Sequence, residues 1–206
     1  MTDKFIIEGF WQGKDNCICI AIIKAAIIKY GFNRVFKIER KGSHFLITLK
    51  NNLLLTITDT EIKKLNRNSE IIFRRPRDEK KKLILRRLKR YVRLCFAVIV
   101  RNIQLNGYEG KEYTQTDAVQ KLLLKGIKTD HIHTLLGLHR KTVHAHKLAH
   151  KHLLSFKRKK ATLLYSDNHI VVASGGYYDN YGEAKKLGTR MPSLRGRKAK
   201  FWYELK

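Results

Sequence analysis

Cysteine is scarce in this sequence, which has three such residues, Cys17, Cys19 and Cys95, among 206. An odd and sparse set of thiols excludes a disulfide framework, so we expect reduced thiols and a cytoplasmic location. Long apolar runs are also missing. Leu94 to Val100 is far shorter than the roughly 20 residues that span a bilayer, and the run from Ile18 predicts a core helix. We therefore expect no membrane segment.

Acidic residues are few as well, with 17 Asp and Glu against 44 Lys and Arg, which gives a net charge of +27. Such an excess indicates a polyanionic partner, either nucleic acid or an acidic surface. The charge is concentrated between residues 74 and 93, where a solvated helix face is the alternative interpretation. The candidate nucleic-acid contacts in this run are Arg74, Arg75, Arg77, Arg86, Arg87 and Arg90.

The composition, 43% hydrophobic and 30% charged residues, is typical of a globular protein with one sizeable core. Residues 34–38 alternate like a strand. Two β-rich runs around Asn51 and Asn52 predict a hairpin over 44–58. Thr58 and Glu61 are spaced as a capping box, which predicts a helix that continues to Leu65. This order of elements indicates an α+β fold rather than repeated βαβ units.

Pro76 is expected to break the chain before a basic helix. Its apolar positions, roughly 3.6 residues apart, are Leu83, Ile84, Leu88, Tyr91, Val92 and Cys95. Residues 106–116 predict a loop. We expect a single domain over 1–206, in which 74–157 form a basic, mostly helical insertion or subdomain.

A helix is predicted to start at Cys17, with Asp15 and Asn16 as N-cap residue types and Gly31 as the stop. Apolar side chains surround this helix, so we expect it to be buried at the centre of the fold and packed against an antiparallel sheet. Cys17 lies in the first turn, where unpaired N–H groups and the helix dipole favour an anion. This setting lowers the pKa of a thiol and suits a nucleophile.

The C-terminal part predicts a strand over 161–165, a second strand over 169–173 and a returning strand over 177–181. A three-residue loop between the last two would place His169 and Asp179 on one face of the sheet. A two-residue loop would turn Asp179 to the other face and put Asn180 in its place. Either residue could orient an imidazole.

The Gln12-Gly13-x-x-x-Cys17 segment, the helix after it, the Asn51–Asn52 hairpin and the His169–Asp179 segment resemble papain- and calpain-like cysteine peptidases, in particular small intracellular bacterial or phage types. The Gln-to-Cys loop is one residue shorter than in papain. The resemblance implies a papain-like fold with Cys17 as nucleophile, His169 as base, Asp179 as its orienting residue, and Gln12 with the Cys17 N–H as the oxyanion hole. It also implies a peptide or protein substrate and no cofactor.

Residues 117–154 resemble the helix-turn-helix of LuxR-type regulators. The matching positions are Gly126, Ile132, Leu136, Lys141, Thr142, Val143, His146 and Lys147. The resemblance implies that Lys141, Thr142 and Lys147 belong to the turn and recognition helix that contact DNA. The alternative is a helical layer that covers the central helix. His146 and His150 are spaced like zinc ligands, but no nearby Cys or carboxylate completes a set, so we expect no metal site.

Three functions therefore stay open. The favoured hypothesis is a papain-like cysteine hydrolase, most simply a peptidase, with a basic surface for a polyanion. The second is a nucleic-acid-binding protein that uses 117–154. The third is an inactive structural component of a nucleoprotein particle.

Overall fold

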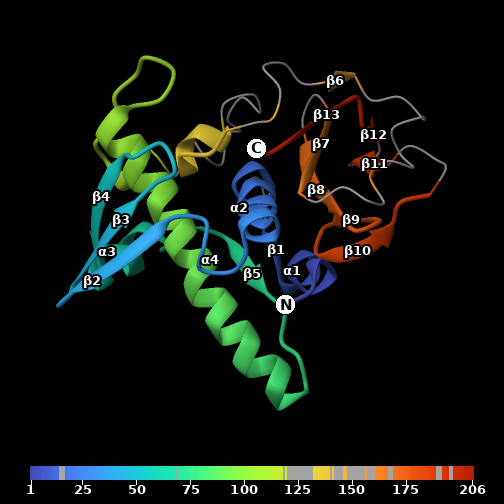
Figure 1. Ribbon diagram of the computed structural model, residues 1–206, viewed down its shortest axis with the longest axis horizontal. Coiled ribbons are helices and arrows are strands. Elements are labelled where there is room, and N and C mark those ends of the chain that lie inside the picture. The colour runs from blue at the N-terminus through green and yellow to red at the C-terminus, as the bar shows by residue number, and fades with distance from the viewer. Residues whose placement is uncertain are drawn as a thin grey trace.

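Helix α2 (Cys17–Tyr30) lies at the centre of the molecule, between helix α4 (Glu79–Asn106) and a β-sheet (Figure 1). Residues on every side of α2 are fully buried, among them Ile22, Ile23, Ala25 and Ala26. A helix that is apolar all round is stable only when it is covered on all sides. The predicted buried central helix is therefore confirmed.

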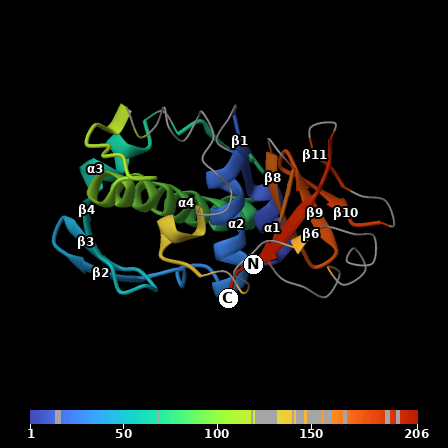
Figure 2. The same cartoon turned by 90° about the horizontal axis from the view of Figure 1, so that it is seen from above.

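In this computed structural model the described residues are 1–13, 17–67, 69–117, 119, 132–139, 141, 146–147, 156, 161–166, 169–188, 192–194 and 197–206. Helices and antiparallel sheets alternate irregularly along these residues, which confirms the α+β class. Seen from above, α4, α2 and the C-terminal sheet follow one another across the molecule (Figure 2).

The C-terminal sheet is antiparallel, with the strand order β10-β9-β8-β7-β13-β6. Its strands are β6 (His146–Lys147), β7 (Thr162–Ser166), β8 (His169–Ser174), β9 (Tyr177–Asn180), β10 (Glu183–Lys186) and β13 (Phe201–Glu204). Strands β7 and β8 are buried along their whole length, because α2 packs against one face and a second cluster around Phe156 and Trp202 covers the other. Their continuous apolar sequences follow from this double coverage.

A smaller sheet has the order β2-β3-β4, and helix α3 follows it. The bounds are β2 (Lys37–Lys41), β3 (His44–Thr48), β4 (Leu54–Thr58) and α3 (Asp59–Leu65). The predicted hairpin is confirmed, with Asn52 at φ 65° in its turn, and so is the capping box. The strand predicted over 34–38 is wrong: the strand begins at Lys37, because the Val35 N–H donates to the Tyr91 hydroxyl (3.0 Å) and the Val35 side chain is buried in the core.

Helix α4 begins after Asp78, whose side chain accepts a hydrogen bond from the Lys81 N–H. Its second half is buried in the same core as α2. Its first turns project beyond the rest of the molecule (Figure 1). Leu83 and Ile84, predicted from periodicity to lie on the buried face, are therefore 60% and 40% exposed. Periodicity identified the helix, but it could not show where the covering elements end.

The remaining short elements are α1 (Asp3–Gly9), β1 (Phe10–Gln12), β5 (Ile71–Phe73), the 3₁₀ helix η1 (Ile132–Leu136), β11 (Ser193–Leu194) and β12 (Arg197–Lys198). Strands β1 and β5 pair with each other, as do β11 and β12. Within the described ranges, no helix combines the length and the apolar character that crossing a membrane requires.

Candidate active site

Gln12 is the last residue of β1 and is held by pairing with β5. Its partner in the ladder is Ile71, and the Gly13 N–H then donates to the Glu70 carbonyl at 2.7 Å. A Cβ atom at position 13 would lie 2.9 Å from that same carbonyl oxygen, so a larger residue would push the two segments apart. The glycine after Gln12 is thus explained by close backbone approach.

The side-chain amide of Gln12 is buried, with the residue 7% exposed. Within the described residues, its Nε2 atom has no hydrogen-bond partner. An unsatisfied buried donor costs about 1–3 kcal/mol, so such groups in native proteins call for an explanation.

His169 is the first residue of β8 and is 4% exposed. It lies opposite Ser166 of β7. Its imidazole stacks on the Tyr181 ring, with the ring centroids 5.4 Å apart and the planes 16° from parallel. Tyr181 belongs to the turn after β9, so the plane of the imidazole is set by a residue twelve positions further along the chain.

A small cavity of about 10 Å³ brings three of the predicted catalytic residues together. This is about the volume that one water molecule needs. Its lining residues are Trp11, Gln12, Ile20, His169, Ile170, Val171, Asp179 and Tyr181. Gln12, His169 and Asp179 come from β1, β8 and β9, so the cavity forms only when the N- and C-terminal parts of the chain pack together.

Cys17 is the first residue of α2, as predicted. Its side chain lies outside the described part of the chain, as do Asp15 and Asn16, the predicted N-cap residues. Ile20 of the same helix lines the cavity. Residues three apart on an α-helix lie about 60° apart around the axis, so Cys17 is on the face of α2 that borders the cavity, one turn nearer the N-terminus.

The position of Asp179 differs from the one that strand alternation predicts. Ser174 pairs with Tyr177, so the loop consists of the two residues Gly175 and Gly176. For a loop of this length, strand alternation predicts that Asn180 lies beside His169. Asp179 lines the cavity instead. The β8–β9 ladder covers only Ala173↔Tyr178 and Ser174↔Tyr177, and β9 then pairs along β10, so the alternation does not extend to His169.

The Asp179 carboxylate is held by two donors. Its Oδ2 atom lies 2.7 Å from the Lys24 Nζ, and its Oδ1 accepts from the Gly182 N–H at 2.8 Å. Lys24 is fully buried and also donates to the Ile7 carbonyl at 2.7 Å. Burial lowers the pKa of Lys24, and the negative charge of Asp179 opposes that shift.

Lys24 was not predicted as part of the site. It follows Cys17 by seven residues, which is nearly two full turns, so the two positions lie within about 20° of each other around the helix. The ion pair thus fixes β9 on the same face of α2 on which Cys17 lies. The available signal was a single lysine in a helix that is otherwise apolar on that side, at heptad spacing from the candidate nucleophile.

Protein-family models, curated proteins and solved structures contain no match to this chain.

The other two cysteines are buried in the core, Cys19 in α2 and Cys95 in α4. Burial raises the pKa of the Cys95 thiol well above its usual value. Both thiols are therefore shielded from reagents, as expected for structural cysteines.

All six arginines predicted to contact nucleic acid are exposed on and before α4. The exposed residues are Arg74, Arg75, Arg77, Arg86, Arg87 and Arg90. Arg74 forms an ion pair with Glu8 (3.0 Å). Lys141 is 3.8 Å from the Glu204 carboxylate. Thr142 and the Lys147 side chain lie outside the described residues.

The backbone at His146–Lys147 corrects one feature of the helix-turn-helix prediction. These two residues, expected in a recognition helix, form strand β6 and pair with Trp202 and Phe201 at the edge of β13. Ile132–Leu136 form a short 3₁₀ helix. The edge of β13 supplies hydrogen-bond partners that a sequence pattern for a helix does not reveal.

Within the described residues, no group of three or more His, Cys, Asp or Glu side chains is arranged to hold a metal ion. The His146 side chain and all of His150, which are spaced like zinc ligands, lie outside those residues.

Proposed function

We propose that this protein is a papain-like cysteine hydrolase that cleaves peptide amides. The observation that carries the proposal is the buried Gln12 amide without a partner among the described residues, at a cavity shared with His169. That cavity borders the face of α2 on which Cys17 is the first residue. A hydrogen-bond donor, a base and a helix-terminal thiol are the three components that acyl transfer requires.

In the acylation step, Cys17 Sγ attacks the substrate carbonyl carbon while His169 takes the thiol proton. The carbonyl oxygen becomes an oxyanion that accepts hydrogen bonds from Gln12 Nε2 and the Cys17 backbone N–H. The volume of the cavity suits a single oxygen atom, which supports this use. Collapse of the intermediate breaks the C–N bond, and the His169 imidazolium donates its proton to the departing amine.

In the second step, water attacks the thioester and His169 removes its proton. The C–S bond then breaks to release the acid, and the His169 imidazolium returns the proton to Cys17 Sγ. Asp179 would orient the imidazole. A carboxylate can accept about four hydrogen bonds, and the two from Lys24 and Gly182 leave sites for an imidazole N–H. Those two bonds also fix the position of the carboxylate.

Alkylation by iodoacetamide tests the nucleophile. In the native protein Cys17 should react much faster than Cys19 and Cys95, and should still react at about pH 6, because a His-paired thiol at a helix N-terminus is partly ionised there. His169→Ala should slow the reaction at that pH. Peptide mapping by mass spectrometry identifies the labelled cysteine, and His139→Ala, an exposed histidine away from the cavity, is the matched control.

Equal labelling rates for all three cysteines would contradict the proposal. So would a Cys17 rate that follows the ordinary thiol pKa of about 8.5 and is the same in the His169→Ala protein.

A further inference from the structure

A second, much larger cleft lies between the small sheet and helix α4. It encloses about 1490 Å³ and is bordered by the segment from Phe32 to Arg40, the β3–β4 turn, α3 and the middle of α4. Small-molecule sites usually enclose about 300–1,000 Å³, so this cleft has room for a segment of a polymer. Strand β2, its outer wall, is exposed along its whole length.

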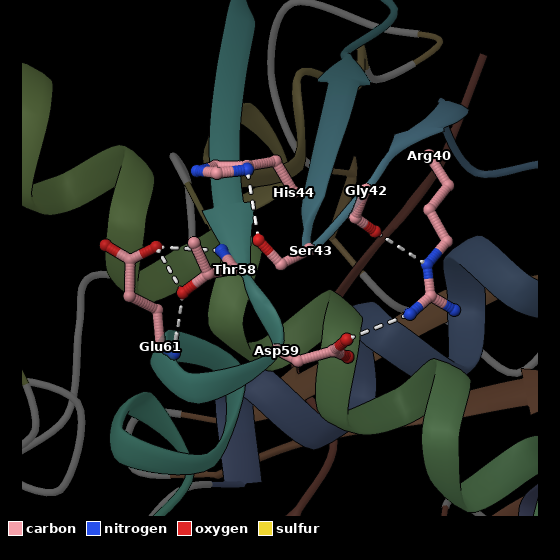
Figure 3. A network of polar contacts seen from close by, with 7 residues as sticks. All are labelled: Arg40, Gly42, Ser43, His44, Thr58, Asp59 and Glu61. Carbon is pink, nitrogen blue, oxygen red and sulfur yellow. Dashed lines mark hydrogen bonds and ion pairs between the residues drawn. The ribbon is translucent and has the colours of Figure 1, made fainter.

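Cations line both walls of this cleft. Helix α4 contributes Arg87, Arg90 and Arg93, and the opposite wall contributes Arg34 and Lys37. None of these five has an acidic partner within 4 Å among the described residues. Of the lining residues, Asp59 is the single acid, and its charge is used by an ion pair with Arg40 at 3.1 Å, which Figure 3 shows.

Like charges are crowded along α4 and just before it. Lys89 lies on the same helix, and its pKa is lowered by desolvation and further by the charges of Arg93 and Arg75. Lys89 lies over the Phe73 ring and does not line the cleft, so an anion between the walls would meet the lining arginines of α4 instead. The binding positions for that anion form a row along the helix, because Arg87, Arg90 and Arg93 are each three residues apart, which is about 4.5 Å along the helix axis.

The floor of the cleft is aromatic. Phe32 and Phe45 are partly exposed, whereas Phe36 and Tyr91 behind them are buried. Tyr91 packs edge-on against Phe32 (5.1 Å between centroids), and Arg40 lies over the Phe45 ring at 5.3 Å. The Tyr91 hydroxyl is fixed by the Val35 N–H at 3.0 Å. Phe32 therefore packs on a ring that is fixed in place, and one face of Phe45 is covered by a guanidinium.

We propose that this cleft binds single-stranded nucleic acid, with phosphates on the arginines of both walls and bases stacked on Phe32 and Phe45. Single strands expose the base faces that aromatic side chains recognise, whereas a duplex hides them and an acidic peptide has none. The cleft begins just after Tyr30, the last residue of α2. Cys17 is the first residue of the same helix and lies about 20 Å away along the helix axis. The proposal therefore stands independently of the hydrolase site.

The test is fluorescence anisotropy of the full-length protein with labelled oligo(dT) and oligo(U) of about 15 nucleotides, and with a duplex of the same length, over a range of salt. Arg87→Gln/Arg90→Gln/Arg93→Gln should weaken single-strand binding and reduce the slope of log K against log salt by about 2. Arg75→Gln/Arg77→Gln/Arg86→Gln removes the same charge from exposed positions outside the cleft and should change the slope much less. Phe45→Leu should weaken single-strand binding by about tenfold and leave duplex binding unchanged.

Unfolding curves confirm that each variant is folded. Equal losses in the two arginine triple variants would overturn the proposal in favour of diffuse charge. A duplex that binds as tightly as the single strands would overturn the stacking arrangement, and no binding at about 50 mM salt would reject the site altogether. A preference for oligo(U) or oligo(dT) would identify RNA or DNA as the ligand.

Discussion

Lys24 and Asp179, 155 residues apart in the sequence, form a buried ion pair with 2.7 Å between Nζ and Oδ2. The lysine side chain is fully buried and that of Asp179 is 8% exposed. The pair joins the central helix to the strand that borders the His169 cavity. Breaking it by removing one partner leaves an uncompensated charge in the core, which is far more costly than removing both.

Asp179→Ala should therefore lower the free energy of unfolding by about 3–5 kcal/mol, while Lys24→Met/Asp179→Leu should recover most of that loss. Urea denaturation followed by circular dichroism gives both values. Glu39→Gln is the control, because Glu39 pairs with Lys41 at 3.5 Å on the surface and such pairs contribute about 0–1 kcal/mol. A double variant less stable than Asp179→Ala would show that the pair is not the cause.

Gly182 connects the site to Trp11, the neighbour of Gln12. Its φ is +80°, and a Cβ there would lie 2.6 Å from Trp11 Cε3. Gly182→Ala should lower stability by about 1–3 kcal/mol, because it combines backbone strain with a steric overlap, and should shift the indole fluorescence. Gly188→Ala is the matched control, since a Cβ at that position has nothing within 4 Å. Equal melting temperatures for the two variants would contradict this account of the turn.

The capping box at α3 predicts a pH dependence. Desolvation alone would raise the pKa of Glu61. The hydrogen bonds that Glu61 accepts from the Thr58 backbone and hydroxyl (Figure 3) outweigh this effect, together with the charges of Arg101 and His44, so the pKa is lowered. The stabilisation is therefore present above the unfolded value of about 4.3 and is lost as the pH falls through the lowered folded value.

Thr58→Ala should cost about 1 kcal/mol at neutral pH, and the cost should shrink below the folded pKa of Glu61. Urea unfolding at several pH values measures it. Thr60→Ala, an exposed threonine within the same helix, is the control. The same pH dependence in both variants would show that the capping box is not responsible.

Local signals were sufficient to predict much of the fold. The Asn51–Asn52 turn, the Thr58–Glu61 capping box and the break at Pro76 before the basic helix act over a few residues, and each was placed correctly. The strand at 34–38 was misplaced because Val35 bonds to Tyr91, 56 residues away. Such a contact leaves no trace in the local pattern.

In the candidate site, too, local motifs were predictable and long-range packing was not. Gln12, His169 and Asp179 were predicted from motifs, and the structure gathers them around one cavity. The reason Asp179 lies there was not predictable from strand alternation, since it depends on where the β8–β9 ladder ends. The Lys24 partner depends on how β9 packs on α2, which no spacing within either segment encodes.

The central claim is that Cys17, His169 and Gln12 form a working acyl-transfer site, and hydrolysis of p-nitrophenyl acetate tests it most directly. We predict turnover with acetylation of Cys17 alone, loss of both in Cys17→Ala, and acylation slower by about 10²–10³-fold in Gln12→Ala. His169→Ala should lose turnover, and Gln104→Ala, a glutamine bonded to Thr114 far from the cavity, should retain it. Hydrolysis by Cys17→Ala at the wild-type rate would contradict the claim.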